Sequence, residues 1–151
     1  FSHALDGFGF VVPKCEGRSI LACTWTSSKF PHRAPEGYVM IRCYLGGALQ
    51  EEIAEKDEST LITLVRQDLK EIMGVCEEPV FSKAFHNRKS NVQYHVNHSQ
   101  RIDAVMQGLE SGLFLAGSAY RGIGIPDCIQ SGTQSAESAI QLLMGKSNAE
   151  I

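Results

Sequence analysis

The sequence GLFLAGSAYRGIGIPDCI, residues 112–129, decides the fold of this chain. It opens with a compact apolar run, 113–116, of the kind that forms a buried strand. Three glycines follow: Gly117, Gly122 and Gly124. Glycines permit a tight turn and let a ligand approach the backbone without interference from Cβ atoms. Asp127, with Gln130 three residues later as in a capping box, predicts the N-cap of a helix. The pattern therefore predicts strand, glycine turn and helix in succession.

The predicted turn is a place for an electron-rich group. The first amides of a helix lack internal partners, and the aligned peptide dipoles make that end partly positive. Strand–glycine–helix units also occur in folds that bind nothing there, so both interpretations stay open. The turn is not a dinucleotide fingerprint, because Asp127 occupies the position of the third glycine. Small and apolar residues along the following helix predict close packing against a sheet: Ile129, Gly132, Ala136, Ala139, Ile140 and Leu143.

Composition indicates a chain large enough for one domain with a core, since it has 151 residues. Hydrophobic residues at 43% and charged residues at 21% are typical of soluble globular domains. A formal charge of −3 without a basic cluster argues against a nucleic-acid surface. No apolar run approaches the roughly 18 to 20 residues that span a bilayer, and no secretory signal is visible. The chain begins at Phe1, within a stretch that leads into a strand, so we expect a piece of a longer protein.

Cysteines and histidines do not predict a metal site. The cysteines are scattered without a C-x-x-C pair: Cys15, Cys23, Cys43, Cys76 and Cys128. Their odd number fits a reducing, cytosolic compartment. Cys128, at a predicted helix start, could be a reactive thiol, although packing is the role that we favour. His86, His95 and His98 lack helical ligand spacing and a companion carboxylate. Ser118 lies beside the glycine turn but not in a nucleophile elbow, so a hydrolase is not supported.

The rest of the chain predicts a mixed α/β (α+β) fold, with a small, mostly antiparallel sheet, about three helices and two packed layers. The predicted strands are 7–13, 19–26, 38–45, 80–85 and 113–116, of which the first three form an antiparallel meander. The predicted helices run from Asp57 to about Met73 with Gly74 as terminator, from Asn97 to Gly112, and from Asp127 towards the C-terminus.

Residues 116–132, AGSAYRGIGIPDCIQSG, resemble the C-terminal flavin-contacting segment of the porphyrinogen oxidases. These FAD enzymes of the flavin amine oxidase superfamily aromatise protoporphyrinogen or coproporphyrinogen. Further landmarks of the family lie in the same order, at 7–13, 30–37, Gly46-Gly47, Gln93-Tyr94 and 98–102. The resemblance covers nearly the whole chain, which would correspond to roughly the last third of such an enzyme.

The resemblance implies a division of the chain. Residues 1–111 would be part of the substrate-binding domain and its return to the FAD domain. Residues 112–145 would be the last strand, glycine turn and helix of the FAD-binding domain, and 146–151 a tail. The dinucleotide fingerprint of the FAD domain would lie upstream.

The resemblance also implies flavin-binding residues. Ile123, Gly124 and Ile125 would lie against the flavin ring, and Gly117 and Ser118 near the pyrophosphate and ribityl chain. The helix start at Asp127 would stabilise negative charge at the N1–C2=O end of the reduced ring.

The chain departs from the family pattern in one loop and at one position of the turn. Asn87 stands where the family typically has a flavin-contacting Trp, so it joins the candidate flavin-binding residues. Val92 stands where Pro is usual, and Arg121 where an acidic residue is common. Arg121 could face substrate carboxylates or solvent, and we favour solvent.

The function implied is oxygen-dependent oxidation of a porphyrinogen to the porphyrin in haem synthesis, by the soluble bacterial coproporphyrinogen type rather than a membrane-embedded one. The resemblance implies FAD as cofactor, no metal and a cytoplasmic location, and leaves a peripheral membrane contact open. It assigns no catalytic side chain here, because the flavin accepts the hydride. The isolated chain is expected to be inactive, and its uncovered apolar faces would favour self-association. Two alternatives remain: another flavin amine oxidase or desaturase, and a non-catalytic α/β binding module.

Overall fold

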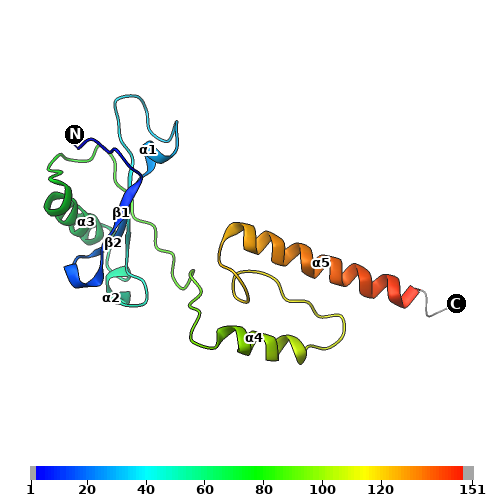
Figure 1. Ribbon diagram of the computed structural model, residues 1–151. Helices are drawn as coiled ribbons and strands as arrows, with labels where there is room; N and C mark the ends of the chain where they lie inside the picture. The colour runs from blue at the N-terminus through cyan, green and yellow to red at the C-terminus, as the bar shows by residue number, and fades with distance from the viewer. Residues whose placement is uncertain (1–2, 148–151) are drawn as a thin grey trace. The chain divides into compact units, whose positions relative to one another are not determined.

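The computed structural model describes residues 3–147 and divides into two compact units, 1–88 and 89–151. The first unit holds the sheet and its helices, and the second holds two helices joined by a long turn (Figure 1). The predicted mixed α/β class is confirmed. The three longest helices, α3, α4 and α5, correspond to the three that the sequence predicts.

The sheet of the first unit is a three-stranded antiparallel meander, as predicted. Its strands are β1 (Gly9–Val11), β2 (Ile20–Trp25) and β3 (Ile41–Leu45), in the order β1-β2-β3. Short helical turns lie between and after them: η1 (Lys14–Glu16), α1 (Thr26–Lys29) and α2 (Glu51–Ala54). Cys23, in the central strand, is paired with Phe10 on one side and Cys43 on the other.

Helix α3 (Glu58–Met73) begins and ends where its capping residues predict. The Asp57 carboxylate accepts the Thr60 amide at 3.0 Å and its hydroxyl at 2.6 Å. A hydrogen bond from the Ser59 hydroxyl, together with these two from Thr60, holds the pKa of Asp57 well below its ordinary value. Gly74 adopts the left-handed conformation at φ 71° and closes the helix.

A buried carboxylate joins α3 to the sheet. Asp68 is only 5% exposed and accepts the backbone amides of Ser19 and Ile20 at 2.8 and 2.9 Å. The Arg18 guanidinium lies 3.8 Å from the other oxygen of this carboxylate and pairs with Glu71 as well. The start of β2 is therefore held on α3 by charge-assisted bonds. The apolar core beside them consists of Ile20, Cys23, Trp25 and Leu61.

The strand predicted over 80–85 is wrong, since these residues pair with no neighbouring strand. The Glu58 carboxylate instead binds the Ala84 amide at 2.9 Å and the Lys83 ammonium at 3.0 Å. Both contacts lower the pKa of Glu58. Side-chain bonds to a helix start therefore replace the ladder that the apolar pattern predicts.

The second unit consists of α4 (His98–Gln107), α5 (Ile125–Ser147) and the segment between them. Asn97 precedes α4 as predicted, but in the left-handed conformation at φ 66° and without a side-chain cap bond. The helix ends at Gly108, earlier than the predicted Gly112. Of the predicted tail 146–151, residues 146 and 147 belong to α5, and 148–151 lie outside the described residues.

The strand predicted over 113–116 does not form. All strands of the described residues belong to the first unit, so this segment has no ladder partner within its own unit. Hydroxyls of α5 bind its backbone instead. Gly117 donates its amide to Ser131 Oγ at 3.1 Å, and Ser135 Oγ donates to the Leu115 carbonyl at 2.9 Å. The run is thereby fixed beside α5 as irregular backbone.

Candidate functional site

The glycine turn leads directly into α5, and its cap differs from the predicted one. The helix begins at Ile125, and the Gly124 carbonyl accepts the Cys128 amide at 3.0 Å. Gly124 therefore occupies the cap position. Asp127, the third helical residue, accepts the Gly124 amide through Oδ2 at 3.2 Å, which is the reciprocal half of a capping box. The predicted N-cap role of Asp127 is wrong. The cap lies three residues earlier, at Gly124, because the helix begins at Ile125, and the Asp127 carboxylate reaches back to the cap amide.

Two of the turn's glycines are required by Asp127 itself. A Cβ on Gly122 would lie 2.4 Å from the Asp127 Cβ, and one on Gly124 would lie 2.9 Å from Asp127 Oδ2. Gly122 also has a left-handed φ of 68°. A Cβ on Gly117, at φ 106°, would meet nothing within 4 Å. Of these three positions, only Gly117 offers the open approach to the backbone that the sequence predicts for all of them.

Two aromatic side chains brace the turn from outside. The Tyr94 hydroxyl donates to the Ser118 carbonyl at 2.5 Å, and His98 Nε2 lies 2.9 Å from the Tyr120 carbonyl. Because a carbonyl can only accept, His98 Nε2 carries the proton. The two rings are stacked, with centroids 4.1 Å apart and planes 9° from parallel. Both residues lie in sequence landmarks of the resemblance, but the sequence alone assigned them no role.

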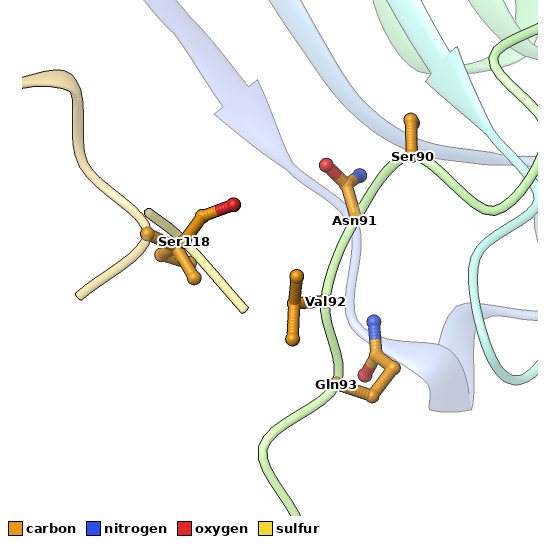
Figure 2. A pocket seen from close by; sticks show the side chains of 6 residues that line it. Ser90, Asn91, Val92, Gln93 and Ser118 are labelled. Carbon is orange, nitrogen blue, oxygen red and sulfur yellow. The ribbon is translucent and has the colours of Figure 1, made fainter. Parts of the chain in front are cut away.

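A cavity of about 430 Å³ opens beside the turn, within the second unit. Figure 2 shows Asn91, Val92 and Gln93 along one side of it and Ser118 on the other. The lining residues are Ser90, Asn91, Val92, Gln93, Ser118 and Ile123. Apart from backbone groups, this lining presents only hydroxyl, amide and aliphatic side chains. It can bind a polar ligand and cannot itself supply a side chain that titrates near neutral pH.

Exposed apolar side chains mark the entrance to α5. Ile123 is 68% exposed and Ile125 is 78% exposed, on either side of Gly124. The first-turn amides of a helix have no carbonyl four residues earlier within it. The cap amide that precedes them here, that of Gly124, donates to the Asp127 carboxylate. A flat ligand with an apolar face and polar edge atoms fits these surroundings.

Five of the six candidate flavin-binding residues lie on this one turn: Gly117, Ser118, Ile123, Gly124 and Ile125. Ser118 and Ile123 also line the cavity, together with Val92 of the divergent loop. Asn87 belongs to the first unit, which is described apart from the turn.

Arg121 forms an ion pair with Asp103 of α4, and both side chains remain more than half exposed. Arg121 therefore faces solvent, as favoured from the sequence, with an exposed ion-pair partner, and the cavity lining does not include it. Cys128 Sγ lies 4.0 Å from the Gly122 carbonyl. This contact fits the packing role favoured for the thiol.

Residues 3–147 contain no group of three or more His, Cys, Asp or Glu side chains placed to hold a metal ion. No helix in that range has both the length and the apolar character needed to cross a bilayer.

Comparison with known proteins identifies the class. Residues 3–140 match the family described as flavin containing amine oxidoreductase, and the chain belongs to this family. Within it, the chain is 38% identical to a coproporphyrinogen III oxidase of Bacillus subtilis (strain 168) over 91% of its own length and 30% of the relative's. It is 36% identical to a coproporphyrinogen III oxidase of Staphylococcus aureus, over 89% of the chain and 30% of the relative. It is 30% identical to a mitochondrial protoporphyrinogen oxidase of Nicotiana tabacum, over 93% of the chain and 29% of the relative. The chain thus spans about 30% of the length of these curated relatives.

Proposed function

We propose that the protein containing this chain is an FAD-dependent oxidase that converts a porphyrinogen to the porphyrin in haem synthesis, with oxygen as electron acceptor. The observation that carries the proposal is the glycine turn at the start of α5, with its adjoining cavity, in a chain that belongs to a flavin family. Coproporphyrinogen III is the favoured substrate, since the two relatives of that name are 38% and 36% identical, against 30% for the tobacco protoporphyrinogen oxidase.

The turn would hold the flavin by shape and by backbone polarity. Ile123 and Ile125 offer exposed aliphatic surface suited to the face of a flat ring. Gly117, with open space where a Cβ would lie, permits close approach of the ribityl and pyrophosphate part, beside Ser118. The α5 start brings amide dipoles to the ring edge, while the Gly124 amide is held by the Asp127 carboxylate. Asn87 is proposed as a further contact because it takes the place of the family's Trp.

Tyr94 and His98 are proposed to fix the turn for this task. Each donates a hydrogen bond to a carbonyl of the turn, Ser118 and Tyr120 respectively. A carbonyl held by a hydrogen bond fixes the plane of its peptide group, and the amide of the same peptide group is thereby held in one orientation. Positioning by these two rings would make the binding surface rigid before the ligand arrives.

The cavity lining suits a reaction whose hard step belongs to the cofactor. When bound, a flavin supplies acceptance of a hydride from the substrate carbon. The side chains around the cavity offer hydrogen bonds and apolar contact, without an acid–base pair. Their proposed work is to orient ligands and to exclude water.

The division of the chain remains part of the proposal: residues 1–111 with the substrate-binding domain, and 112–145 as the last piece of the FAD-binding domain. A partner strand for 113–116 would then come from that domain. The cytoplasmic location, with a peripheral membrane contact left open, stays a prediction from the resemblance.

The test uses the full-length protein. We expect a yellow preparation with flavin absorbance at about 450 nm, and faster oxygen-dependent porphyrin fluorescence from coproporphyrinogen III than from protoporphyrinogen IX. Ile123→Asp should lower the flavin content, whereas Val11→Asp, at an even more exposed position of β1, should not. Flavin without turnover of either porphyrinogen would favour another flavin amine oxidase or desaturase. A colourless full-length protein would overturn the proposal in favour of a non-catalytic binding module.

A further inference from the structure

Two cysteines face each other across the central and third strands of the first unit. The register pairs Cys23 of β2 directly with Cys43 of β3. Both belong to the same sheet face, since directly opposite residues of antiparallel strands point the same way. Cys23 is only 2% exposed, and Cys43 is half-buried.

The hydrogen-bond pattern places this pair where cross-strand side chains approach most closely. Thr26 donates its amide to the Met40 carbonyl at 2.8 Å, in the same register as the two cysteines. Thr26 and Met40 thus form a hydrogen-bonded pair. Hydrogen-bonded and non-hydrogen-bonded pairs alternate along an antiparallel ladder, so Cys23 and Cys43, three positions further along, form a non-hydrogen-bonded pair. On the β1 side of the central strand, Trp25 donates its amide to the Phe8 carbonyl at 3.0 Å. Residues two apart in a strand direct their main-chain groups to the same neighbour, so those of Cys23 also point towards β1 and away from β3. This agrees with the assignment.

Such a pair has Cα atoms about 4.5 Å apart, which lies within the roughly 4.4 to 6.8 Å that a disulfide spans. The two thiols also interact through a hydrogen bond. The Cys43 thiol donates to the Cys23 sulfur, which lowers the pKa of Cys23 and raises that of Cys43. The pair therefore places a thiol whose pKa is lowered next to a second thiol that can resolve it.

We propose that Cys23 and Cys43 are a reversible oxidation site, which closes a cross-strand disulfide between β2 and β3 when the protein meets a hydroperoxide. The inference is independent of flavin binding, because it concerns only the sheet of the first unit.

The chemistry consumes one peroxide and releases two waters. The thiolate of the pair attacks one peroxide oxygen, the O–O bond breaks, and the departing hydroxide takes a proton to become water. The sulfenic acid formed is then attacked by the second sulfur. The S–O bond breaks as the S–S bond forms, and the hydroxide leaves with the second thiol's proton as water. Two thiols are oxidised by two electrons, and the peroxide is reduced by two. A thiol reductant reverses the reaction by exchange.

The test treats the native full-length protein with hydrogen peroxide, blocks free thiols with an alkylating agent under denaturing conditions, and digests it with trypsin without reduction. Cleavage at Arg18, Lys29, Arg42 and Lys56 leaves the two cysteines in separate peptides, 19–29 and 43–56, each with a single cysteine. We expect these peptides to be recovered as one disulfide-linked species that disappears after reduction.

Variants separate this site from general thiol oxidation. Cys43→Ala should abolish the linked species, whereas Cys128→Ala should leave the linkage unchanged. The exposed thiols of Cys15 and Cys76 calibrate the peroxide dose. The proposal is overturned if those two are oxidised while 19–29 and 43–56 remain unlinked in the wild type. It is also overturned if the linkage forms only in protein unfolded before treatment.

Discussion

Replacing Asp68 by alanine should open the junction between α3 and β2. The carboxylate is 5% exposed, and one of its oxygens accepts both the Ser19 and the Ile20 amides. Alanine leaves the buried Ile20 amide and the partly buried Ser19 amide without that acceptor, at about 1–3 kcal/mol for each unsatisfied group. We therefore expect a loss of about 4 kcal/mol in the free energy of opening this junction.

Asparagine offers a graded version of the same change. Its carbonyl oxygen can still accept both amides, but the charge that faces Arg18 is lost. Asp68→Asn should thus cost about 1–2 kcal/mol. Glu71→Ala is the matched control on the same helix, because its carboxylate also pairs with Arg18 while its side chain is 42% exposed. An exposed ion pair is worth at most about 1 kcal/mol.

The assay is amide hydrogen exchange, read at residues 19 and 20 under native conditions. Since about 1.4 kcal/mol is a factor of ten in an equilibrium constant, Asp68→Ala should accelerate exchange at these amides by about 10³-fold. Asp68→Asn should accelerate it by about tenfold, and Glu71→Ala by less. Equal exchange rates in Asp68→Ala and Glu71→Ala would refute the reasoning. Equal rates in the alanine and asparagine variants would show that the two amide bonds are not what holds the junction.

Three further predictions concern the turn and the α3 cap. Gly122→Ala should lower the free energy of unfolding by about 2–4 kcal/mol, because Gly122 has a left-handed φ and an added Cβ would overlap with Asp127. Adding Asp127→Gly should recover part of this loss in a double-mutant cycle measured by urea unfolding. Strict additivity of the two changes would disprove the overlap. Tyr94→Phe should remove the hydrogen bond to the Ser118 carbonyl and lower the local stability of the turn by about 1 kcal/mol. Amide hydrogen exchange should then be faster in peptides that cover the turn and unchanged in those that cover α4. Unchanged exchange in the turn would contradict the bracing role. Because the pKa of Asp57 is lowered in the folded chain, its stabilisation is complete above the ordinary value of 3.8, falls progressively below that value, and is gone once the pH is below the lower folded value. The difference in urea midpoint between wild type and Asp57→Ala should therefore be constant from neutral pH down to about the ordinary value and shrink below it, and a difference that does not shrink there would argue against the cap.

Sequence reasoning succeeded where the determining chemistry is local. Asp57 and Gly74 bound α3 because capping depends on residues within one turn. The meander was predictable because turn signals separate β-rich runs. The run 113–116 does not form a strand within the described residues, because a strand needs a partner that can lie far away in sequence, and here the α5 hydroxyls bind its backbone.

The bracing and anchoring side chains were missed for a different reason. Tyr94 and His98 act through carbonyls of a distant turn, which no spacing rule indicates. Asp68 did carry a signal, since it stands seven residues after the buried Leu61 and thus on the same apolar helix face. An acidic residue in that position predicts a buried acceptor. The candidate flavin-binding residues and the domain division stay predictions.

The hydroxyls of Ser131 and Ser135 have a consequence for assembly. They form hydrogen bonds with the Gly117 amide and the Leu115 carbonyl. A β-strand added beside this segment would need the same two main-chain groups. Any sheet that extends onto this run must therefore exchange hydroxyl partners for main-chain partners. Serine is well suited to such an exchange, because its small side chain can rotate and return its bond to its own helix, as Ser138 already does with the Gln134 carbonyl at 2.9 Å.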